Sequence, residues 1–387
     1  MAMGLNNHGW TLIMDQLLDH SVTSTQFPAV SGTVRISIDQ LNLPLGTLGG
    51  KNSSINWNGI NERGESVGMS ETPVPDPNGE DICGFGTHAT CLPFLWQNGV
   101  MRALPTVGGN NGQASAINDS GQVVGYAENG LMDSTCPAGV TNNRVDLPVL
   151  WDTDKGKDKA HALATIGSDT DGVAFGINNQ GQAVGYSGTC TAVNFAVLWE
   201  NGTANPLPDF ESPGAIAFAI NDHNQIVGQA VNSEGTTLAA IWENNVVRSL
   251  GGLLPGDVAS FATSINNRGE VVGSSFAFSG WSRGLIWQNG KMTDLNTVFP
   301  ASSHLYVISA SNINESGQIA GMALETTGPN AWQVVHSYLA TPVEEDQGKS
   351  VADVVPTHPK FAFPVANVGK QLSPRSAHCT IHALGTF

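Results

Sequence analysis

Long apolar runs and positive charge are what this sequence lacks. No stretch of about 18 apolar residues occurs in the 387-residue chain, so the sequence predicts no transmembrane helix. Charged residues make up only 13% of the chain, and 33 acidic residues against 16 Lys and Arg give a formal net charge of −17. Such an acidic surface repels phosphate backbones and anionic membranes, which argues against a nucleic-acid partner.

Familiar catalytic motifs are also missing. The chain contains no Gly-x-Ser-x-Gly, no His-Glu-x-x-His and no phosphate-binding Gly-Lys-Ser/Thr. Residues 1–20 have neither a basic start nor a long apolar core, so no signal peptide is visible. Three readings stay open: a signal was removed, the chain is a fragment, or the protein stays inside the cell. The sequence carries no signal for an oligomeric state.

What is present is a repeated phrase, Ile-Asn-x-x-Gly, with a second Gly four residues later. The distance from the Ile to this closing Gly is 8 residues in all six copies, which run from Ile60 to Gly68, Ile117 to Gly125, Ile177 to Gly185, Ile220 to Gly228, Ile265 to Gly273 and Ile313 to Gly321. A fixed period of this kind is typical of an array of small identical units.

One unit reads as four short antiparallel strands. Residues 114–118 alternate small and apolar side chains, Asn118–Gly121 reads as a tight turn, and residues 122–126 return as a second strand. A third strand ends in an apolar residue and Trp, as in Leu150-Trp151, and a fourth follows a polar turn. The expected fold class is therefore all-β, a β-propeller of four-stranded blades, in which we expect the repeated Trp to pack between blades.

The two ends of the array leave the number of blades open. Leu5-Asn6-Asn7-His8-Gly9 matches the turn phrase, which favours seven blades with a propeller over residues 1–342. The last unit lacks a clear fourth strand. Either Ser350–Val355 supplies that strand, or residues 33–48 from the N-terminus complete the last blade and close a ring of six blades. Residues 343–387 carry no repeat, and we predict a tail or linker there.

Four of the five cysteines follow a closing Gly, in equivalent loops. Cys83, Cys91, Cys136 and Cys190 are therefore candidates for two disulfides, which would favour an oxidising compartment. A Cys83–Cys91 pair is easier to form, whereas Cys136–Cys190 needs neighbouring loops to meet. Free thiols are the alternative, and the spacing does not resemble a zinc site.

In a propeller the Asn-x-x-Gly turns gather on one face, here the turn face, and the loops between second and third strands gather on the other, the loop face. The long insertions 69–92 and 126–147 belong to the loop face, where we expect binding. The candidate ligand-binding residues there are Trp57, which stands where other units have Ala three residues before the Ile, and the link residues Asp169, Asp171, Glu211, Asp257 and His304. Ordinary turn capping by these acids, and space filling by Trp57, are the alternatives.

A bound metal ion is not predicted, although calcium stays a weaker alternative. Asp169-Thr170-Asp171-Gly172 has acids at alternate positions, and the loop 152–158 holds three. Neither completes a calcium-binding loop of the EF-hand type, and two lysines in the second loop oppose a cation.

The phrase Ala-x-x-Ile-Asn-Asp-x-Gly-Gln-Val-Val-Gly, with its apolar-Trp pair and the Leu-Gly-Gly link, resembles the HAF repeat family of predicted extracellular bacterial proteins. The match is carried by residues 114–125, 174–185, 217–228, 262–273 and 310–321, and by the links at Leu48–Gly50 and Leu250–Gly252. Asn224 departs from the pattern, where the other units have Gly. The resemblance implies an extracellular, propeller-like protein and brings no catalytic residues with it.

These observations favour binding over catalysis. The leading hypothesis is an extracellular, non-catalytic propeller that recognises a carbohydrate or a protein through the loop face. A propeller hydrolase or lyase acting on a polysaccharide with carboxylates around the axis is the first alternative. A structural or self-associating surface protein is the second.

Overall fold

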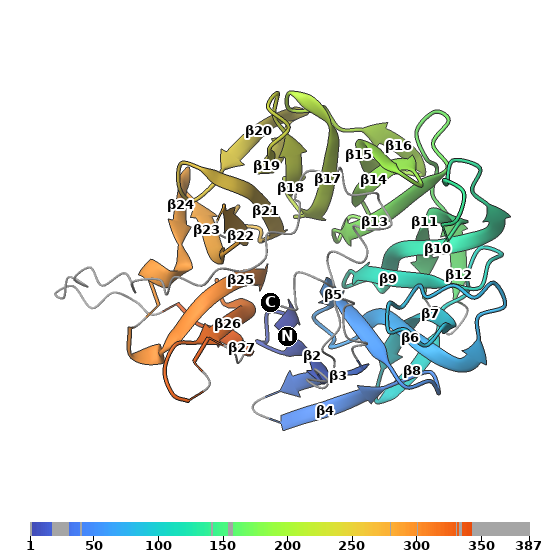
Figure 1. The fold of residues 1–387 in the computed structure, drawn as a ribbon, viewed down its shortest axis with the longest axis horizontal. Helices are drawn as coiled ribbons and strands as arrows, with labels where there is room; N and C mark the ends of the chain where they lie inside the picture. The colour runs from blue at the N-terminus through green and yellow to red at the C-terminus, as the bar shows by residue number, and fades with distance from the viewer. Residues whose placement is uncertain are drawn as a thin grey trace.

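A computed structural model describes residues 2–17, 31–38, 41–140, 142–153, 158–278, 280–299, 301–329, 331–332 and 335–342. Within these ranges the chain is almost entirely β-strand, with two single-turn 3-10 helices, η2 (Leu295–Thr297) and η3 (Ala301–Ser303). Seven antiparallel blades surround a common axis in chain order, which is a β-propeller (Figure 1). Single parallel bridges join blade 2 to blade 3 and blade 5 to blade 6. None of the helices in the described part of the chain is long and apolar enough to cross a membrane.

The blades follow one another along the sequence. Their strands are β1 (Ala2–Leu5), β2 (Thr11–Leu17), β3 (Ser31–Ile38) and β4 (Leu41–Gly46) in blade 1; β5 (Ser53–Ile60), β6 (Ser66–Pro75), β7 (Ala89–Gln97) and β8 (Val100–Ala103) in blade 2; β9 (Gly112–Ile117), β10 (Gln122–Met132), β11 (Arg144–Asp152) and β12 (Lys159–Ala162) in blade 3; β13 (Asp171–Ile177), β14 (Ala183–Thr189), β15 (Ala192–Glu200) and β16 (Thr203–Pro206) in blade 4; β17 (Ser212–Ile220), β18 (Ile226–Val231), β19 (Thr237–Glu243) and β20 (Val246–Gly251) in blade 5; β21 (Asp257–Ile265), β22 (Val271–Ala277), β23 (Ser282–Gln288) and β24 (Lys291–Asp294) in blade 6; and β25 (Leu305–Ile313), β26 (Ile319–Glu325) and β27 (Val335–Ala340) in blade 7.

Seven blades are therefore confirmed, and the six-bladed alternative is wrong. Strands β3 and β4, which that alternative used to complete the last blade, belong to blade 1, where β3 pairs with β2 and β4 pairs with β3. Blade 7 has three strands among the described residues. The fourth strand suggested at Ser350–Val355, and the tail predicted for residues 343–387, lie outside the described residues.

The inner hairpin of each blade explains the repeated glycines. The turn Gly takes a left-handed backbone, with φ of 86° at Gly121, and Asn224 adopts the same conformation with φ of 62°. The closing Gly faces a bulge in the inner strand. A Cβ atom at Gly185 would lie 1.8 Å from the carbonyl oxygen of Val173, so only Gly fits there.

The core lies between the blades. Seven apolar clusters each join two neighbouring blades, and Trp151, Trp199 and Trp242 are buried within three of them. The indole N–H of each donates to a backbone carbonyl of the preceding link, at 2.7 to 2.8 Å. For these three residues the predicted role of the repeated Trp, packing between blades, is confirmed.

A ring of seven asparagines holds the inner hairpins together. In each repeat the Asn side chain donates to the backbone carbonyl of the corresponding Asn in the next blade, at 3.0 to 3.2 Å; the members are Asn6, Asn61, Asn118, Asn178, Asn221, Asn266 and Asn314. The last of these bonds runs from Asn314 to Asn6, so blade 7 closes onto blade 1 (Figure 1). Asn6, from the Leu-Asn phrase at residues 5–9, therefore takes part in the ring like the Asn of the other six units.

Both predicted disulfides are present on the loop face. Cys83 and Cys91 join within the blade 2 insertion, with a Cα–Cα distance of 5.7 Å. Cys136 and Cys190 link the long loop of blade 3 to blade 4, with a Cα–Cα distance of 5.1 Å. The neighbouring loops therefore do meet, as the second pairing required.

Candidate functional site

The propeller axis holds a cavity of about 200 Å³ at the turn face, lined by residues from all seven blades. Its outer edge, here the axial rim, consists of the residue that follows each ring Asn: Asn7, Glu62, Asp119, Asn179, Asp222, Asn267 and Glu315. Below the rim, the repeated Ile residues and Leu5 line the wall together with the ring asparagines, and most of the surface that the cavity exposes is polar. Deeper still, Asn58, Ser264 and Asn312 contribute polar groups.

The axial rim forms a second closed ring of hydrogen bonds. The backbone N–H of each rim residue donates to the side-chain oxygen of the next, at 2.7 to 3.0 Å. Carboxylates and amides alternate around this ring, except where Glu62 stands next to Asp119. Seven positions cannot alternate perfectly, so one like pair is unavoidable. These bonds fix four carboxylates and three amides around the mouth.

The electrostatics of the rim reflect this crowding of acids. Partial burial raises the pKa of Glu62, and the charges of Asp119 and Glu315 raise it further, while the Asn7 N–H and His8 act in the opposite direction. The guanidinium of Arg63 does not line the cavity; it pairs with Glu65 at 2.5 Å and donates to the backbone carbonyl of the rim residue Asp119. The mouth therefore carries a net negative charge.

The floor of the cavity depends on an irregularity in β5. Ile55 and Ile60 pair with Gly68 and Ser66, which leaves four residues between them, whereas two residues separate the equivalent positions of β9. The prediction that Trp57 replaces the Ala of other units is therefore wrong: Ile55 occupies that position, and Trp57 lies in a two-residue insertion that bulges into the axis. The bulge reaches β9, where Asn58 pairs with Ala116.

This bulge closes the central channel. The Trp57 ring packs edge-on against Phe218 of blade 5, with ring centroids 5.6 Å apart, and the Asn58 amide donates to the Phe218 carbonyl at 3.3 Å. Ile82, from the β6–β7 loop, packs against the same aromatic cluster on the loop-face side. Among the described residues, the channel is thus open toward the turn face and filled toward the loop face.

Two of the predicted site residues, Asp169 and Asp257, attach the link that precedes a blade to the strands of that blade. Asp169 accepts hydrogen bonds from Ser187 at 2.7 Å and Asn194 at 2.6 Å. Asp257 accepts one from Ser275 at 2.6 Å and forms a buried ion pair with Arg283 at 2.5 Å. These contacts explain why carboxylates recur in the links.

The other predicted link residues are dispersed. Asp171 is buried and accepts a hydrogen bond from the Asp146 N–H at 2.8 Å. Glu211 is exposed and accepts one from the Ser233 N–H at 2.8 Å. His304 is exposed, with φ of 54°. The structure does not bring the six predicted residues together, and their role in binding stays a prediction.

Blades 6 and 7 present an aromatic patch on the loop face, formed by Trp281, Tyr306 and Trp332, and Phe278 precedes Trp281 by three residues in the same loop. Trp281 lies 5.4 Å from Trp332 and 5.8 Å from Tyr306 between ring centroids. Tyr306 is buried beneath, the two Trp side chains are partly exposed, and Phe278 is 83% exposed. The charges of Arg283 and Asp257 both act on Tyr306, which places that ion pair beside the patch.

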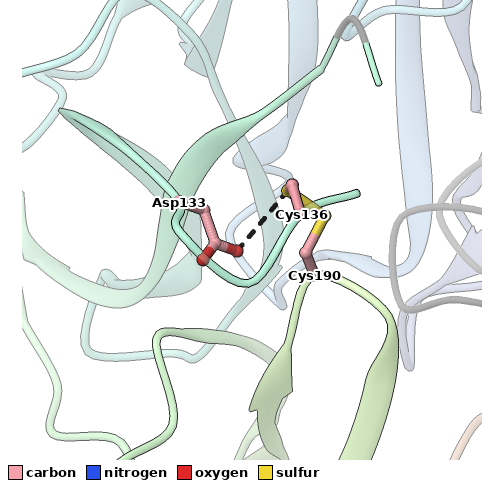
Figure 2. A group of neighbouring side chains, drawn as sticks. All are labelled: Asp133, Cys136 and Cys190. Carbon is pink, nitrogen blue, oxygen red and sulfur yellow. Dashed lines mark hydrogen bonds between the residues drawn. A yellow bond between two sulfur atoms is a disulfide. The ribbon is translucent and has the colours of Figure 1, made fainter. Parts of the chain in front are cut away.

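The Cys136–Cys190 bridge lies against an acidic side chain but does not form a metal site. The carboxylate of Asp133 approaches Cys136 Sγ at 3.6 Å (Figure 2). Both sulfur atoms belong to the disulfide, so neither is a thiolate that could ligate a metal. Burial alone would raise the pKa of Asp133, but hydrogen bonds from Asp171, Thr135 and Thr170 lower it overall.

A second group of acids is buried under the blade 2 insertion. Glu80, Glu128 and Asp76 are all buried, and the Asn111 amide donates to Glu128 at 3.1 Å and to Asp76 at 2.9 Å. Burial raises the pKa of Glu80 to about 7, and the charges of Glu128 and Asp76 add to this effect. This group ties the insertion to blade 3.

The sequence reasoning missed the axial rim, although a signal existed. The residue after the repeated Asn is Asn, Asp or Glu in all seven units, and a polar position that recurs in every repeat must gather around the axis of a ring. The aromatic patch had no such signal, since its residues lie in loops outside the repeated phrase.

Neither a protein-family model nor a curated protein matches the sequence. Solved structures with similar folds include the β-propeller domain of the Trilobed protease from Pyrococcus furiosus (9% identity, 90% of this chain and 99% of that one, TM-score 0.49). Others are the acylaminoacyl peptidase of Pyrococcus horikoshii (13%, 88% and 51%, 0.48) and TolB from Acinetobacter baumannii (13%, 70% and 59%, 0.41). The propeller assignment rests on the strand pairing above, and nothing about activity is taken from these proteins. The HAF resemblance stays a prediction.

Proposed function

We propose that this chain is an extracellular, non-catalytic binding propeller of the HAF repeat type that recognises a carbohydrate through its loop face. The observation that carries the proposal is the aromatic patch. Indole rings that remain partly exposed in a folded protein offer flat apolar surfaces with a polar edge, and such surfaces suit the C–H faces and hydroxyl groups of sugars.

The backbone of the patch supports a binding role. Trp332 has φ of 66°, a left-handed conformation that bulky residues rarely adopt, and it is held there by a 2.7 Å hydrogen bond from its N–H to the Glu325 carbonyl. Backbone strain of this kind gathers at ligand sites. In this conformation the indole of Trp332 lies 5.4 Å from the Trp281 ring and 5.5 Å from the Tyr306 ring, between centroids.

Polar groups lie in the same two blades as the rings. Arg283 is buried in its ion pair with Asp257, and its Nε is itself buried and has no hydrogen-bond partner among the described residues. His336, which is exposed, approaches the half-buried Glu325 at 3.4 Å. Asp257 and His304, two of the residues predicted from sequence, belong to the same two blades.

Two further observations favour this class of function. The Cys83–Cys91 and Cys136–Cys190 disulfides suit an extracellular setting. A carbohydrate is favoured over a protein ligand because the patch is small, whereas protein interfaces need about 800 Å² from each partner.

A glycan array followed by calorimetry with the selected oligosaccharide tests the proposal. We expect Trp281→Ala and Trp332→Ala each to weaken binding about tenfold or more, since stacking contributes roughly 1–3 kcal/mol for each ring. Val246→Ala is the matched control, because Val246 is 64% exposed at the turn between β19 and β20, on the opposite face of the propeller. The absence of any glycan ligand, or equal affinity in all three variants, refutes the proposal. Release of shortened product from the bound oligosaccharide would show catalysis instead.

A further inference from the structure

The axial cavity on the turn face takes no part in the proposed carbohydrate site, which lies at the other end of the blades. It is open at the axial rim and closed at its inner end by Trp57, Phe218 and Ile82. A cavity that combines Ile side chains and polar groups beneath a ring of acids is a distinct binding environment. Its features point to one class of ligand.

The rim supplies negative charge that no side chain in the mouth neutralises among the described residues. Glu62, Asp119, Asp222 and Glu315 all line the cavity, and their oxygens are already fixed by backbone N–H donors of the neighbouring blade. Arg268 does not line the cavity; it pairs with Glu270 at 2.5 Å and donates to the backbone carbonyl of the rim residue Glu315. A cation entering the mouth therefore meets acceptors that need no rearrangement.

The inner end of the cavity supplies an acceptor without a donor. Asn312 is only 6% exposed, and its amide nitrogen donates to the Trp57 carbonyl at 2.6 Å and to the Asn58 side chain at 3.2 Å. The carbonyl oxygen of the same amide accepts no hydrogen bond from the described part of the chain and is not shielded from solvent. Since Asn312 lines the cavity, this oxygen is available to a donor inside it.

The walls distinguish an organic cation from a metal ion. The sides between rim and floor are formed by Ile60, Ile117, Ile177, Ile220, Ile265 and Ile313, together with Leu5. A metal ion requires several carboxylates that converge on one point. Among the described residues, no group of three acidic, His or Cys side chains at the rim brings its ligand atoms within 4.8 Å of one another. Alkyl groups, in contrast, gain from burial against Ile.

We propose that the axial cavity binds an organic ligand that carries a primary ammonium group on a short alkyl chain. The ammonium group donates to the Asn312 carbonyl oxygen at the floor or to the rim carboxylates at the mouth, and the alkyl chain contacts the Ile wall. A free amine and the Lys side chain of a partner protein share this chemistry.

Calorimetric titration of the intact protein tests the idea with three probes of similar size: n-propylammonium, n-propanol and propionate. We expect binding of the ammonium probe alone, with an affinity that falls as salt is added. Glu62→Gln and Asp222→Asn keep an acceptor for the neighbouring N–H while they remove one charge, so each should weaken binding about three- to tenfold. Glu234→Gln, an equal charge change in an exposed loop of the other face, should leave binding unchanged.

A second readout locates the ligand. In an NMR pH titration, the bound ammonium probe should lower the raised pKa of the Glu62 carboxyl, because a nearby cation favours the charged form. A peptide with a Lys at its end, compared with 1,4-diaminobutane, separates a protein partner from a free amine. Binding of n-propanol as tight as that of n-propylammonium, equal losses in Glu234→Gln and Glu62→Gln, or no binding of any probe would each overturn the proposal. Carbohydrate binding at the aromatic patch is unaffected by any of these results.

Discussion

Replacing one asparagine of the inner ring should cost far more stability than a single side chain usually does. Asn178 is 4% exposed and uses both ends of its amide. Its oxygen accepts the N–H groups of Gln180 at 3.1 Å and Gln182 at 2.9 Å. Its nitrogen donates to the Gln182 side chain at 2.6 Å and to the Asn221 carbonyl of the next blade at 3.2 Å. Only an amide on a short side chain supplies these donors and acceptors together.

The size of the effect follows from the groups left without partners. Asn178→Ala strands two backbone donors and one backbone acceptor, at roughly 1 kcal/mol each, so we expect a loss of about 3 kcal/mol in the free energy of unfolding. Denaturant unfolding monitored by Trp fluorescence measures it. Asn205→Ala is the control, because Asn205 is exposed and its two hydrogen bonds are 3.3 Å long; its loss should stay within about 0.5 kcal/mol.

Asn178→Asp separates the donor role from simple loss of volume. The carboxylate keeps both acceptor contacts but faces the Asn221 carbonyl with no hydrogen to donate. We therefore expect a loss of about 3 kcal/mol at neutral pH. Because burial raises the folded-state pKa of the new Asp, stability should be recovered in acid, where the protonated carboxyl can donate again. If Asn178→Ala proves no more damaging than Asn205→Ala, or Asn178→Asp shows no pH dependence, the ring does not hold the blades together.

Two further predictions concern the loop face. Since the folded-state pKa of Glu80 is raised to about 7 from 4.5, its contribution to stability is fully present below pH 4.5 and is lost as the pH rises through about 7. Glu80→Gln should therefore be more stable than the parent by about 2 kcal/mol at roughly pH 8 and equal to it in acid. A difference in unfolding free energy between the two proteins that is the same at both pH values, measured by denaturant unfolding, would contradict this. Among the disulfides, removing Cys136–Cys190, which spans 54 residues, should cost about 4 kcal/mol, against about 2.5 kcal/mol for Cys83–Cys91, which spans 8. Thermal unfolding of the paired Cys→Ser variants compares them, and the reverse order would show that loop closure is not the main effect.

Strand alternation and turn chemistry were sufficient to predict the features of a unit that depend only on residues close together in the sequence. The turn at Asn118–Gly121, the strands around it and the placement of Trp151 follow from alternation and turn chemistry, and the structure shows all three. The pairing of Cys83 with Cys91 could be predicted for the same reason, because they lie only 8 positions apart in the sequence.

Trp57 shows where that reasoning fails. Its spacing from Ile60 matches the Ala of other units, yet the pairing of Ile55 with Gly68 moves the register and pushes Trp57 into the axis. A bulge is decided by what the neighbouring strands and the opposite blade can accommodate, here Phe218, which lies 161 residues away in the sequence.

The sequence by itself determined that repeated units form blades, that Gly recurs at most of the hairpin turns and bulges, and that four cysteines share one face. The tertiary structure alone decided how the polar residues after each Asn bond to one another in a closed rim, that Trp57 closes the channel, and that Trp281, Tyr306 and Trp332 meet. The physical reason is that strand period and turn chemistry act over a few residues, whereas these sites arise only when distant blades are brought around a single axis.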